Sequence, residues 1–455
     1  MKKVLVANRG EIAVRIIRAC HDLDLQTVAV YSLADAQALH VLHADEAICI
    51  GNPPALESYL NIPAILSACE ITGADAVHPG YGFLSENADF ASLCEHSGLT
   101  FIGPSPKAIA LLGNKAQAKS VAKRAGCPVI PGSDGVVASE EEALRQAEKI
   151  GFPVFIKASA GGGGKGIRIA EGKEDFASKF RAARIEAEAS FGNPDIYLEK
   201  MITGPRHVEI QILGDKEGNY IHLGERDCTI QRLRQKLIEE APSPLPSNRL
   251  RQEMGEAAIA IARAADYHTV GTVEFLLDAG GKFYFMEVNT RIQVEHTITE
   301  ELTGVDLMRE QIRTAGKGRL SRRQDEISFR GHVFQFRINA EDPADRFTPS
   351  PGRLEYYVPP GGPGVRIDSA CYPGYSIPPY YDSLIAKLIV KGEDRKGAVA
   401  IGRRALREFH IGGIKSTLPF HLYMLRNRRF LSGKYDLGFV DELMSKGCRF
   451  ISEEN

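Results

Sequence analysis

The chain has 455 residues, a length that suggests about three domains. With 44% hydrophobic and 25% charged residues it has the composition of a packed globular protein, which excludes disordered and collagen-like chains. Lysine and arginine number 56 and aspartate and glutamate 58, so the net charge of -2 gives no overall field that would attract nucleic acid or an anionic membrane. We therefore expect no nucleic-acid partner, and local charges must hold any bound anion.

The eight cysteines are dispersed and never form a C-x-x-C pair, so neither a zinc site nor a disulfide framework is expected. Residues 1–9 contain only four consecutive apolar residues, too few for a signal peptide. No segment approaches the roughly 18 apolar residues of a membrane span. These features predict a soluble cytoplasmic protein with no membrane partner.

The segment 1–112 alternates short β-rich runs with helical patterns. Strands are predicted at Val4–Ala7, Thr27–Tyr31 and Ala76–His78, and a helix at Glu11–His21. Such alternation predicts a parallel, doubly wound sheet. The first turn lacks G-x-G-x-x-G, so the main reason to predict a dinucleotide site is missing.

The segment 113–320 is predicted as a second domain. It begins with a helix over Asn114–Ala125. Strands at Pro153–Ala158 and Ile167–Ile169 enclose the glycine-rich loop 159–166. Further predicted elements are a strand ending at Lys200, a hairpin around Asp215–Asn219 and a long helix over Ser247–Ala265.

The glycine-rich loop is a candidate phosphate site. Backbone N–H groups approach phosphate oxygens closely only where no Cβ intervenes. A Walker A loop would need glycine in place of Ser159 and serine or threonine in place of Gly166, so this is not a P-loop. Taken alone, the loop fits a phosphate-covering hairpin and a mobile surface hairpin equally well.

Two acidic residues face each other in the hairpin predicted over 271–289. Gly280-Gly281 separates two runs of aromatic and aliphatic residues and suits a two-residue turn with positive φ at both positions. Counting outward from that turn places Glu274 opposite Glu287, with Cβ atoms about 5 Å apart. Two carboxylates so close are destabilising unless a cation lies between them, which favours magnesium.

Polar residues continue beyond this hairpin at every second position: Glu287, Asn289, Arg291, Gln293 and Glu295. A solvent-facing strand shows the same alternation. However, carboxylates and an amide suit a hard cation, and the guanidinium, amide and carboxylate that follow suit a small anion and a proton transfer. This order favours a functional face over a solvated one.

Three lysines complement these acids. Lys115 near a helix start, Lys157 before the glycine loop and Lys236 could neutralise phosphates or a small oxyanion, although each alone better fits a solvated surface lysine. Cys228 has no histidine partner and is expected to be a buried structural residue. His207 is expected to be structural or a substrate contact rather than a metal ligand.

The segment 331–446 is predicted as a mixed α+β domain. It starts with a strand-like run at His332–Ile338, passes through the proline- and glycine-rich stretch 359–364 and ends in helical patterns. No internal repeat and no long linker is present, so the three parts are expected to pack together.

Several long motifs follow one another in a fixed order along the chain. They are residues 7–13 (ANRGEIA), 78–87 (HPGYGFLSEN), the loop through Gly166, 206–211 (RHVEIQ), 225–228 (ERDC), 289–296 (NTRIQVEH) and 337–342 (RINAED). Together they resemble the biotin carboxylase family over essentially the whole chain. So many motifs in order are far more specific than any single glycine pattern.

The resemblance implies a fold of mixed α/β and α+β class, the ATP-grasp fold. A Rossmann-like pre-grasp domain would span 1–112, the ATP-grasp domain 113–320 with a mobile lid over about 131–203, and a C-terminal domain of the biotin carboxylase type 331–446. It also implies a reaction. ATP would phosphorylate bicarbonate to carboxyphosphate, which yields CO2 and phosphate; the phosphate would deprotonate the biotin ureido nitrogen, which attacks CO2 to give carboxybiotin.

The resemblance also implies roles for individual residues. ATP would be bound by Lys115, Lys157, Gly162, Gly163, Gly164, Glu199, Lys200, Ile202, His207, Gln231, Arg234, Leu276 and Met286. Magnesium or manganese, expected as two ions, would be held by Glu274, Glu287 and Asn289. Bicarbonate would be held by Lys236, Arg291, Gln293, Val294 and Glu295, with Glu295 as its base. Biotin would contact Tyr81 and Arg337, and Lys236, Arg291, Glu295 and Arg337 would be catalytic.

The only Met-Lys pair is Met1-Lys2, so no biotin attachment lysine in a Met-Lys-Met setting is present. The chain is also too short for a carboxyltransferase domain. The expected substrate is therefore biotin on a separate biotin carboxyl carrier protein, with carboxyltransferase subunits as further partners. The family implies a homodimer and an acyl-CoA acceptor, acetyl-CoA in the first place.

Four positions depart from the family pattern. Arg234 stands where histidine is familiar, Asn114 where aspartate is frequent, Thr297 where proline is usual and Gln335 where glutamate is usual. None removes an expected catalytic group, but they leave the final acceptor open. Two rival hypotheses also stay open: an ATP-grasp ligase for another carboxylate, and a non-catalytic nucleotide-binding subunit.

Overall fold

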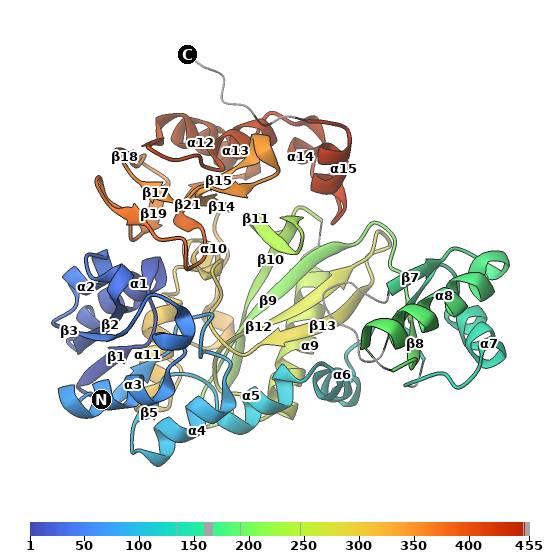
Figure 1. The fold of residues 1–455 in the computed structure, drawn as a ribbon, viewed down its shortest axis with the longest axis horizontal. Helices are drawn as coiled ribbons and strands as arrows, with labels where there is room; N and C mark the ends of the chain where they lie inside the picture. Colours follow the sequence, from blue (N-terminus) through green and yellow to red (C-terminus); the bar gives the residue numbers. More distant parts are fainter. Residues whose placement is uncertain (134, 159–166, 192, 246, 449, 451–455) are drawn as a thin grey trace.

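A computed structural model describes residues 1–133, 135–158, 167–191, 193–245, 247–448 and 450. The glycine-rich loop, with Gly162, Gly163 and Gly164, lies outside the described residues. Over the described part the chain combines helices with parallel and antiparallel sheets (Figure 1). This agrees with the expected α/β and α+β class.

A five-stranded parallel sheet forms the N-terminal part, in the order β3-β2-β1-β4-β5. Its strands are β1 (Lys3–Val6), β2 (Gln26–Ser32), β3 (Glu46–Gly51), β4 (Ala76–His78) and β5 (Thr100–Phe101). Its helices are α1 (Gly10–His21), α2 (Leu39–His43), α3 (Ile62–Thr72), α4 (Ala88–His96) and α5 (Pro106–Gly113). Val4 and Val6 pack in one hydrophobic cluster and Leu5 in another, so both faces are covered. The predicted doubly wound sheet is confirmed.

An eight-stranded antiparallel sheet runs through the middle of the molecule, in the order β13-β12-β9-β10-β11-β14-β21-β19. Its strands are β9 (Arg206–Gly214), β10 (Tyr220–Arg232), β11 (Gln235–Ala241), β12 (Thr269–Leu277), β13 (Phe283–Asn289), β14 (His332–Asn339), β19 (Val365–Ser369) and β21 (Leu384–Gly392). Because β11 pairs with β14, strands of the central and C-terminal segments share one sheet. The two segments are therefore joined by backbone hydrogen bonds as well as by packing.

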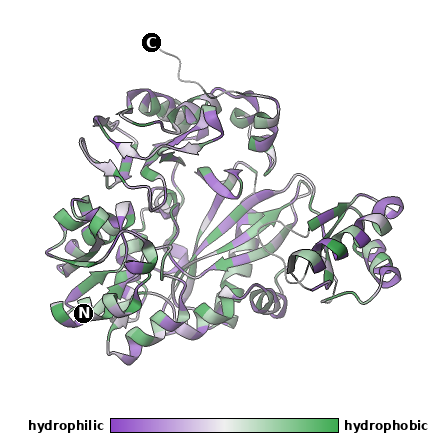
Figure 2. Cartoon of the chain, in the orientation of Figure 1, coloured by the Kyte–Doolittle hydropathy of each residue, from purple (hydrophilic) through white to green (hydrophobic). Residues whose placement is uncertain are grey.

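The large sheet has one apolar and one polar face in its central strands. Val208 and Ile210 of β9 pack with Met254 and Ile261 of α9 (Asn248–Ala264), which Ser247 caps. Hydrophobic and hydrophilic residues are interleaved along these strands in Figure 2. Successive side chains of a strand point to opposite faces, so the polar residues of β9 gather opposite the helix.

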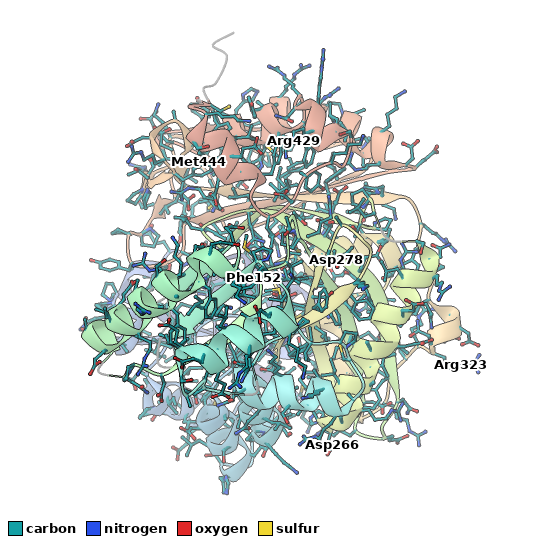
Figure 3. All side chains as sticks on the ribbon, turned by 90° about the vertical axis from the view of Figure 1, so that its right-hand side faces the viewer. Phe152, Asp266, Asp278, Arg323, Arg429 and Met444 are labelled. Carbon is teal, nitrogen blue, oxygen red and sulfur yellow. The ribbon has the colours of Figure 1, made fainter. Side chains whose placement is uncertain are left out.

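A small three-stranded sheet, in the order β7-β6-β8, stands apart at the right of Figure 1. Its elements are α7 (Glu140–Ile150), β6 (Val154–Ala158), β7 (Ile167–Ala170), α8 (Lys173–Phe191) and β8 (Ile196–Lys200). Phe176, Phe180 and Leu198 belong to its own hydrophobic cluster. Figure 3 views the molecule from this side, with Phe152 labelled on the unit and Asp278 labelled at the tip of the β12–β13 hairpin.

The remaining elements connect and cover these sheets. Helix α6 (Lys115–Arg124) is capped by Asn114, whose side chain accepts a hydrogen bond from the Gln117 N–H, as predicted. The others are α10 (His296–Thr303), α11 (Leu307–Lys317), α12 (Arg395–Glu408), α13 (Leu418–Met424), α14 (Arg428–Leu431), α15 (Phe439–Ser445), β15 (Glu341–Asp342), β16 (Thr348–Pro349), β17 (Gly352–Arg353), β18 (Tyr356–Val358), β20 (Ser376–Ile377), β22 (His410–Gly412) and short 3-10 turns at Leu33–Asp35, Ala55–Glu57, Gln324–Glu326 and Pro343–Asp345.

The tip of the β12–β13 hairpin differs from its prediction. The Asp278 N–H donates to the Lys282 carbonyl, so three residues, not two, form the loop, and only Gly281 of the glycine pair has positive φ. Near the tip, Leu277 pairs with Phe283, one residue away from the predicted register. A β-bulge then inserts Met286 into β13, and this extra residue restores the pairing of Glu274 with Glu287.

The polar alternation after Asn289 does not continue as a strand. Strand β13 ends at Asn289, and residues 290–295 run without regular structure into α10. The prediction of an extended strand there was wrong, although the polar side chains still reach one cavity.

Candidate active site

A cleft of about 1150 Å³ lies against the polar face of the large sheet and is closed on one side by β6, β7 and β8. The predicted site residues that line it are Lys115, Lys157, Glu199, Lys200, Ile202, His207, Gln231, Arg234, Lys236, Glu274, Leu276, Met286, Glu287, Asn289, Arg291, Gln293, Val294, Glu295 and Arg337. They come from segments far apart in the chain, which the strand order of the large sheet brings together.

Lys236 of β11 lies at the centre of three buried carboxylates. Its ammonium nitrogen is 2.6 Å from Glu209, 2.6 Å from Glu295 and 3.1 Å from Glu274. Burial alone would lower the pKa of Lys236, but the three carboxylates raise it well above the ordinary lysine value. Burial would likewise raise the pKa of Glu274, yet Lys236 and then His207 hold it well below its usual value. These groups are therefore charged at neutral pH.

Glu209 is a site residue that the sequence analysis did not assign. It is fully buried on β9, and the guanidinium of Arg226 donates to its second oxygen at 2.6 Å. The signal was present in the motif 206–211, where His207, Glu209 and Gln211 alternate with apolar residues. That alternation places Glu209 on the same face as His207.

The predicted metal ligands lie together at the β12–β13 hairpin. Asn289 donates to Glu274 at 2.8 Å, His207 lies 2.8 Å from Glu274, and Lys115 lies 3.3 Å from Glu287. The chain's own positive groups thus neutralise the acid pair, so carboxylate repulsion alone does not demand an ion. The donor set still fits a hard cation, because two carboxylates and an amide oxygen are what magnesium prefers.

Arg337 of β14 joins two carboxylates at the inner end of the cleft. It donates to Glu239 at 2.6 Å and to Glu295 at 3.0 Å. Burial would raise the pKa of Glu295, but Lys236 and Arg337 together lower it well below the ordinary glutamate value. Glu239, fully buried on β11, was not found from the sequence, since nothing distinguishes it from the adjacent Glu240.

Arg291 lies at the edge of the cleft between two acceptors. Its guanidinium donates to Glu86 at 3.0 Å and to the Asn289 side chain at 2.9 Å. Glu86 belongs to the motif at 78–87 and also accepts from the Thr290 N–H. The N-terminal segment thus orients a guanidinium that faces the central segment's cleft.

The outer wall of the cleft carries fewer contacts. Lys157 of β6 is paired with Glu199 of β8, and Lys119 of α6 lies 3.2 Å from the same carboxylate. Lys200 donates to the carbonyls of Gly151 and Phe152 at 2.7 and 2.8 Å, so its ammonium supports the loop before β6.

Tyr81, expected as a biotin contact, does not line the cleft. Its hydroxyl donates to Glu11, and Glu11 lies 2.9 Å from the fully buried ammonium of Lys387. Lys387 also donates to the Val294 carbonyl at 3.1 Å. Tyr81 is therefore connected through two charged groups to the backbone at Val294.

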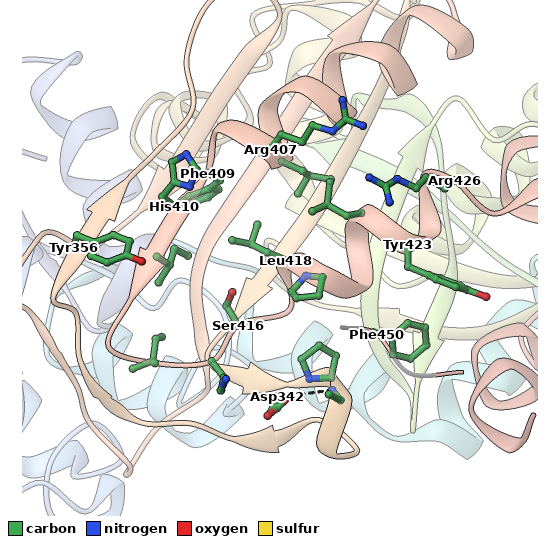
Figure 4. A pocket seen from close by; sticks show the side chains of 18 residues that line it. Asp342, Tyr356, Arg407, Phe409, His410, Ser416, Leu418, Tyr423, Arg426 and Phe450 are labelled. Carbon is green, nitrogen blue, oxygen red and sulfur yellow. Dashed lines mark hydrogen bonds between the residues drawn. The ribbon is translucent and has the colours of Figure 1, made fainter. Parts of the chain in front are cut away.

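A second cavity, of about 880 Å³, lies in the C-terminal segment (Figure 4). Its wall includes Arg407, Tyr423 and Phe450, and it contains none of the predicted site residues. The central cleft is therefore the candidate active site.

Known proteins resemble the chain along its whole length. Family models match in order: "Biotin carboxylase, N-terminal domain" at 1–109, "Carbamoyl-phosphate synthase L chain, ATP binding domain" at 114–323 and "Biotin carboxylase C-terminal domain" at 335–442. Biotin carboxylase 1 of Bacillus subtilis (strain 168) is 55% identical over 442 residues, which cover 97% of this chain and 98% of the relative. The chain belongs to the biotin carboxylase family.

Two further relatives of this biotin carboxylase are named for different carboxylases. One pyruvate carboxylase polypeptide of Methanothermobacter thermautotrophicus is 51% identical over 97% of this chain and 89% of its own. The biotin carboxylase domain of Hydrogenobacter thermophilus 2-oxoglutarate carboxylase, solved as a dimer with MgADP, ADP and bicarbonate, superposes with a TM-score of 0.89 at 50% identity, covering 100% of this chain and 99% of that chain. The chain is accordingly an ATP-grasp ligase of the biotin carboxylase type.

Among the described residues no helix is long and apolar enough to cross a membrane. Cys228 is buried, and its burial, with Glu209 adding to the effect, raises the pKa of its thiol well above the ordinary value. This agrees with its expected structural role.

Proposed function

We propose that this biotin carboxylase uses ATP and bicarbonate to carboxylate biotin carried on a separate carrier protein. The observation that carries the proposal is the placement of Glu295 between Lys236 and Arg337, in the same cleft as the Glu274–Glu287 pair. A base, two fixed cations and a cation site for a polyphosphate then meet in one cavity. The domain limits at 1–112, 113–320 and 331–446 and the lid stay predictions.

Bicarbonate would bind where Lys236, Arg291 and Gln293 converge, beside the Val294 backbone. Glu295 is ionised at neutral pH because two cations lower its pKa, and it can accept the bicarbonate proton only in that form. When the substrate's negative oxygen draws Lys236 toward itself, Glu295 loses part of this stabilisation and becomes a stronger base.

ATP would lie along the outer part of the cleft. Lys115, Lys157 and His207 would meet its phosphates, Glu199 and the backbone at Lys200 and Ile202 would contact adenine, and Gln231, Arg234, Leu276 and Met286 would complete the surface. The same role is proposed for Gly162, Gly163 and Gly164. Glu274, Glu287 and Asn289 would hold magnesium, which when bound neutralises phosphate charge.

Biotin would approach from the side of Arg337. Its guanidinium is permanently charged and fixed by two carboxylates, so it can stabilise negative charge that develops on the ureido oxygen when the nitrogen is deprotonated. Tyr81 acts on this side through Glu11 and Lys387 if it acts at all.

Partners and acceptor follow from the family and belong to the proposal. We propose a homodimer, a biotin carboxyl carrier protein and carboxyltransferase subunits, with acetyl-CoA as the first acceptor to test because pyruvate and 2-oxoglutarate carboxylases are relatives as well. The eight cysteines are free in the described structure, which supports the predicted cytoplasmic location.

The test is carboxybiotin formation from free biotin, ATP and magnesium, with and without bicarbonate. We expect product only with bicarbonate, and ADP release that biotin stimulates. A ligase for another carboxylate would show no dependence on bicarbonate, and a non-catalytic subunit would bind ATP without releasing ADP. Covalent biotin on this chain, detected by mass spectrometry, would contradict its assignment as a separate subunit.

A further inference from the structure

Arg337 is held by a chain of buried hydrogen bonds that ends at two positions where the sequence departs from the family pattern. Arg337 donates to Glu239 at 2.6 Å, Gln335 donates to the other oxygen of Glu239 at 3.0 Å, and the Thr297 hydroxyl donates to the Gln335 carbonyl oxygen. Glu239, Gln335 and Thr297 have no exposed surface. The two departures, at 297 and 335, thus contact each other directly.

Glu239 and Gln335 are direct partners across the β11–β14 ladder. Their side chains must share a dry environment, where an unpaired polar group is costly. An amide at 335 can satisfy both neighbours at once, because its nitrogen donates to Glu239 and its oxygen accepts from Thr297. A carboxylate at 335 could not donate to Glu239 unless it were protonated.

The charge of Glu239 decides what Arg337 touches. Burial raises the pKa of Glu239, Arg337 opposes that rise and Glu295 adds to it. A hydrogen bond donated by Gln335 favours the ionised form. Were Glu239 neutral, Arg337 would keep Glu295 as its only charged partner, and the base and the biotin-binding group would neutralise each other.

We propose that Gln335, oriented by Thr297, acts through Glu239 as a positioning residue for Arg337 in the biotin half of the reaction. This inference rests on the proposed function, and it concerns residues that touch neither ATP nor bicarbonate. Its consequence is a specific one: disturbing the relay should impair use of biotin more than it impairs cleavage of ATP.

Four variants separate positioning from general damage. Gln335→Met keeps the length and removes both hydrogen bonds, Gln335→Glu places a second acid opposite Glu239, Thr297→Val removes only the hydroxyl, and Thr297→Ser restores it. Each is measured for carboxybiotin formation against biotin concentration, for bicarbonate-dependent ATP hydrolysis without biotin, and for thermal unfolding.

We expect Gln335→Met to lower kcat/KM for biotin by about tenfold or more, the value of a hydrogen bond to a buried charge, with a smaller loss in biotin-independent ATP hydrolysis. Thr297→Val should show a weaker loss of the same kind, and Thr297→Ser should recover. If Gln335→Met does not fold, the Thr297 pair decides: equal biotin kinetics in its two members overturn the inference.

Gln335→Glu adds a pH signature. The groups facing position 335 are Glu239 from β11, Thr297 from α10 and Arg337 two residues along β14, while β21 pairs it with Ile389; Glu295 and Lys236 act on Glu239 from beyond Arg337. Two facing carboxylates share a proton at lower pH and repel when both ionise. Biotin-dependent activity of Gln335→Glu should therefore fall as pH rises over a range where the wild type is steady.

The outcomes distinguish the two proposals. A wild-type chain that makes no carboxybiotin overturns the proposed function, and the inference with it. An active wild type together with unchanged biotin kinetics and pH profile in both Gln335 variants overturns the inference alone. Equal losses in the biotin-dependent and biotin-independent reactions also overturn it, because they show damage to the whole site.

Discussion

The floor and the outer wall of the cleft hold their charges in different ways. On the floor, Lys236 touches three carboxylates, and Glu209 and Glu295 are almost fully buried. On the wall, the side chains of Lys119 and Lys157 keep 42% and 21% of their surface exposed and meet mainly one carboxylate, Glu199. Strands of the large sheet fix the floor, whereas a small separate sheet carries most of the wall.

This difference suggests a division of labour. Groups that stabilise developing charge act best when they are fixed before the substrate arrives. Groups that close over a substrate must be able to exchange one partner for another, and surface ion pairs exchange at little cost. We therefore expect substitutions on the floor to affect chemistry and substitutions on the wall to affect nucleotide affinity.

The largest effect is expected for Lys236→Met. It removes the cation that faces bicarbonate and leaves three carboxylates repelling one another, so kcat for bicarbonate-dependent ATP hydrolysis should fall about a thousandfold, the upper range for one lost stabilising donor. Lys119→Met is the matched control on the wall. A Lys236→Met enzyme that keeps its kcat would contradict the division between floor and wall.

The next effect concerns stability in acid. Glu240 of β11 accepts from His332 and Arg395 at 2.8 Å each and from Tyr435. Burial would raise the pKa of Glu240, but these partners lower it to about 2. Because this pKa lies below that of the unfolded chain, its contribution, about 3 kcal/mol, is complete above about pH 4.5 and is lost as pH falls toward 2.

Denaturant unfolding at pH 6 and pH 3 measures this contribution. Glu240→Gln should be less stable than the wild type at pH 6 and should show less loss between the two values. Glu140→Gln on α7 is the control, since the Glu140–Arg181 pair is exposed and screened by solvent. Parallel pH profiles for the wild type and Glu240→Gln would show that the floor strand is not anchored by this charge.

A third prediction concerns the metal ion. Glu274→Gln removes a charge from the proposed ligand set, so the magnesium concentration for half-maximal activity should rise about tenfold to a hundredfold. Chelation by EDTA should abolish ATP cleavage in the wild type, and added magnesium should restore it. Glu253→Gln, at an exposed position of α9, serves as the control. An unchanged magnesium requirement in Glu274→Gln would remove Glu274 from the ligand set.

The smallest effects are expected on the wall. Lys157→Ala should raise KM for ATP about tenfold with kcat nearly unchanged, which is the pattern of lost uniform binding. Lys119→Ala should change KM by about twofold, since its side chain is more exposed and its pair with Glu199 is longer. If either substitution lowers kcat as strongly as Lys236→Met, the wall takes part in the chemistry.

The sequence predicted the elements where one periodicity dominates. The parallel N-terminal sheet, the helix capped by Asn114 and the helix capped by Ser247 all follow local rules of alternation and capping. The polar run after Asn289 misled the strand prediction, because period two was there without a partner strand to pair with. Local pattern cannot show whether a neighbour exists.

The site was predictable where motif and spacing agree, and less so where partners come from distant strands. Glu239 and Glu209 become site residues only because β9, β11 and β14 carry them to Arg337 and Lys236. The Glu274–Glu287 pairing was predicted correctly from a wrong turn: an error of one residue at the tip is cancelled by the bulge at Met286. No sequence rule announces such an insertion.

That inserted residue has a wider consequence for how the hairpin tolerates change. In a regular strand, Met286 and Glu287 would look in opposite directions, yet both border the same cavity. One irregularity thus sets an apolar surface for a ring next to an oxygen ligand for an ion. Loop grafts that lengthen or shorten the tip should be harmless, whereas deleting a single residue between Phe285 and Glu287 would turn one of these two functions away from the substrate.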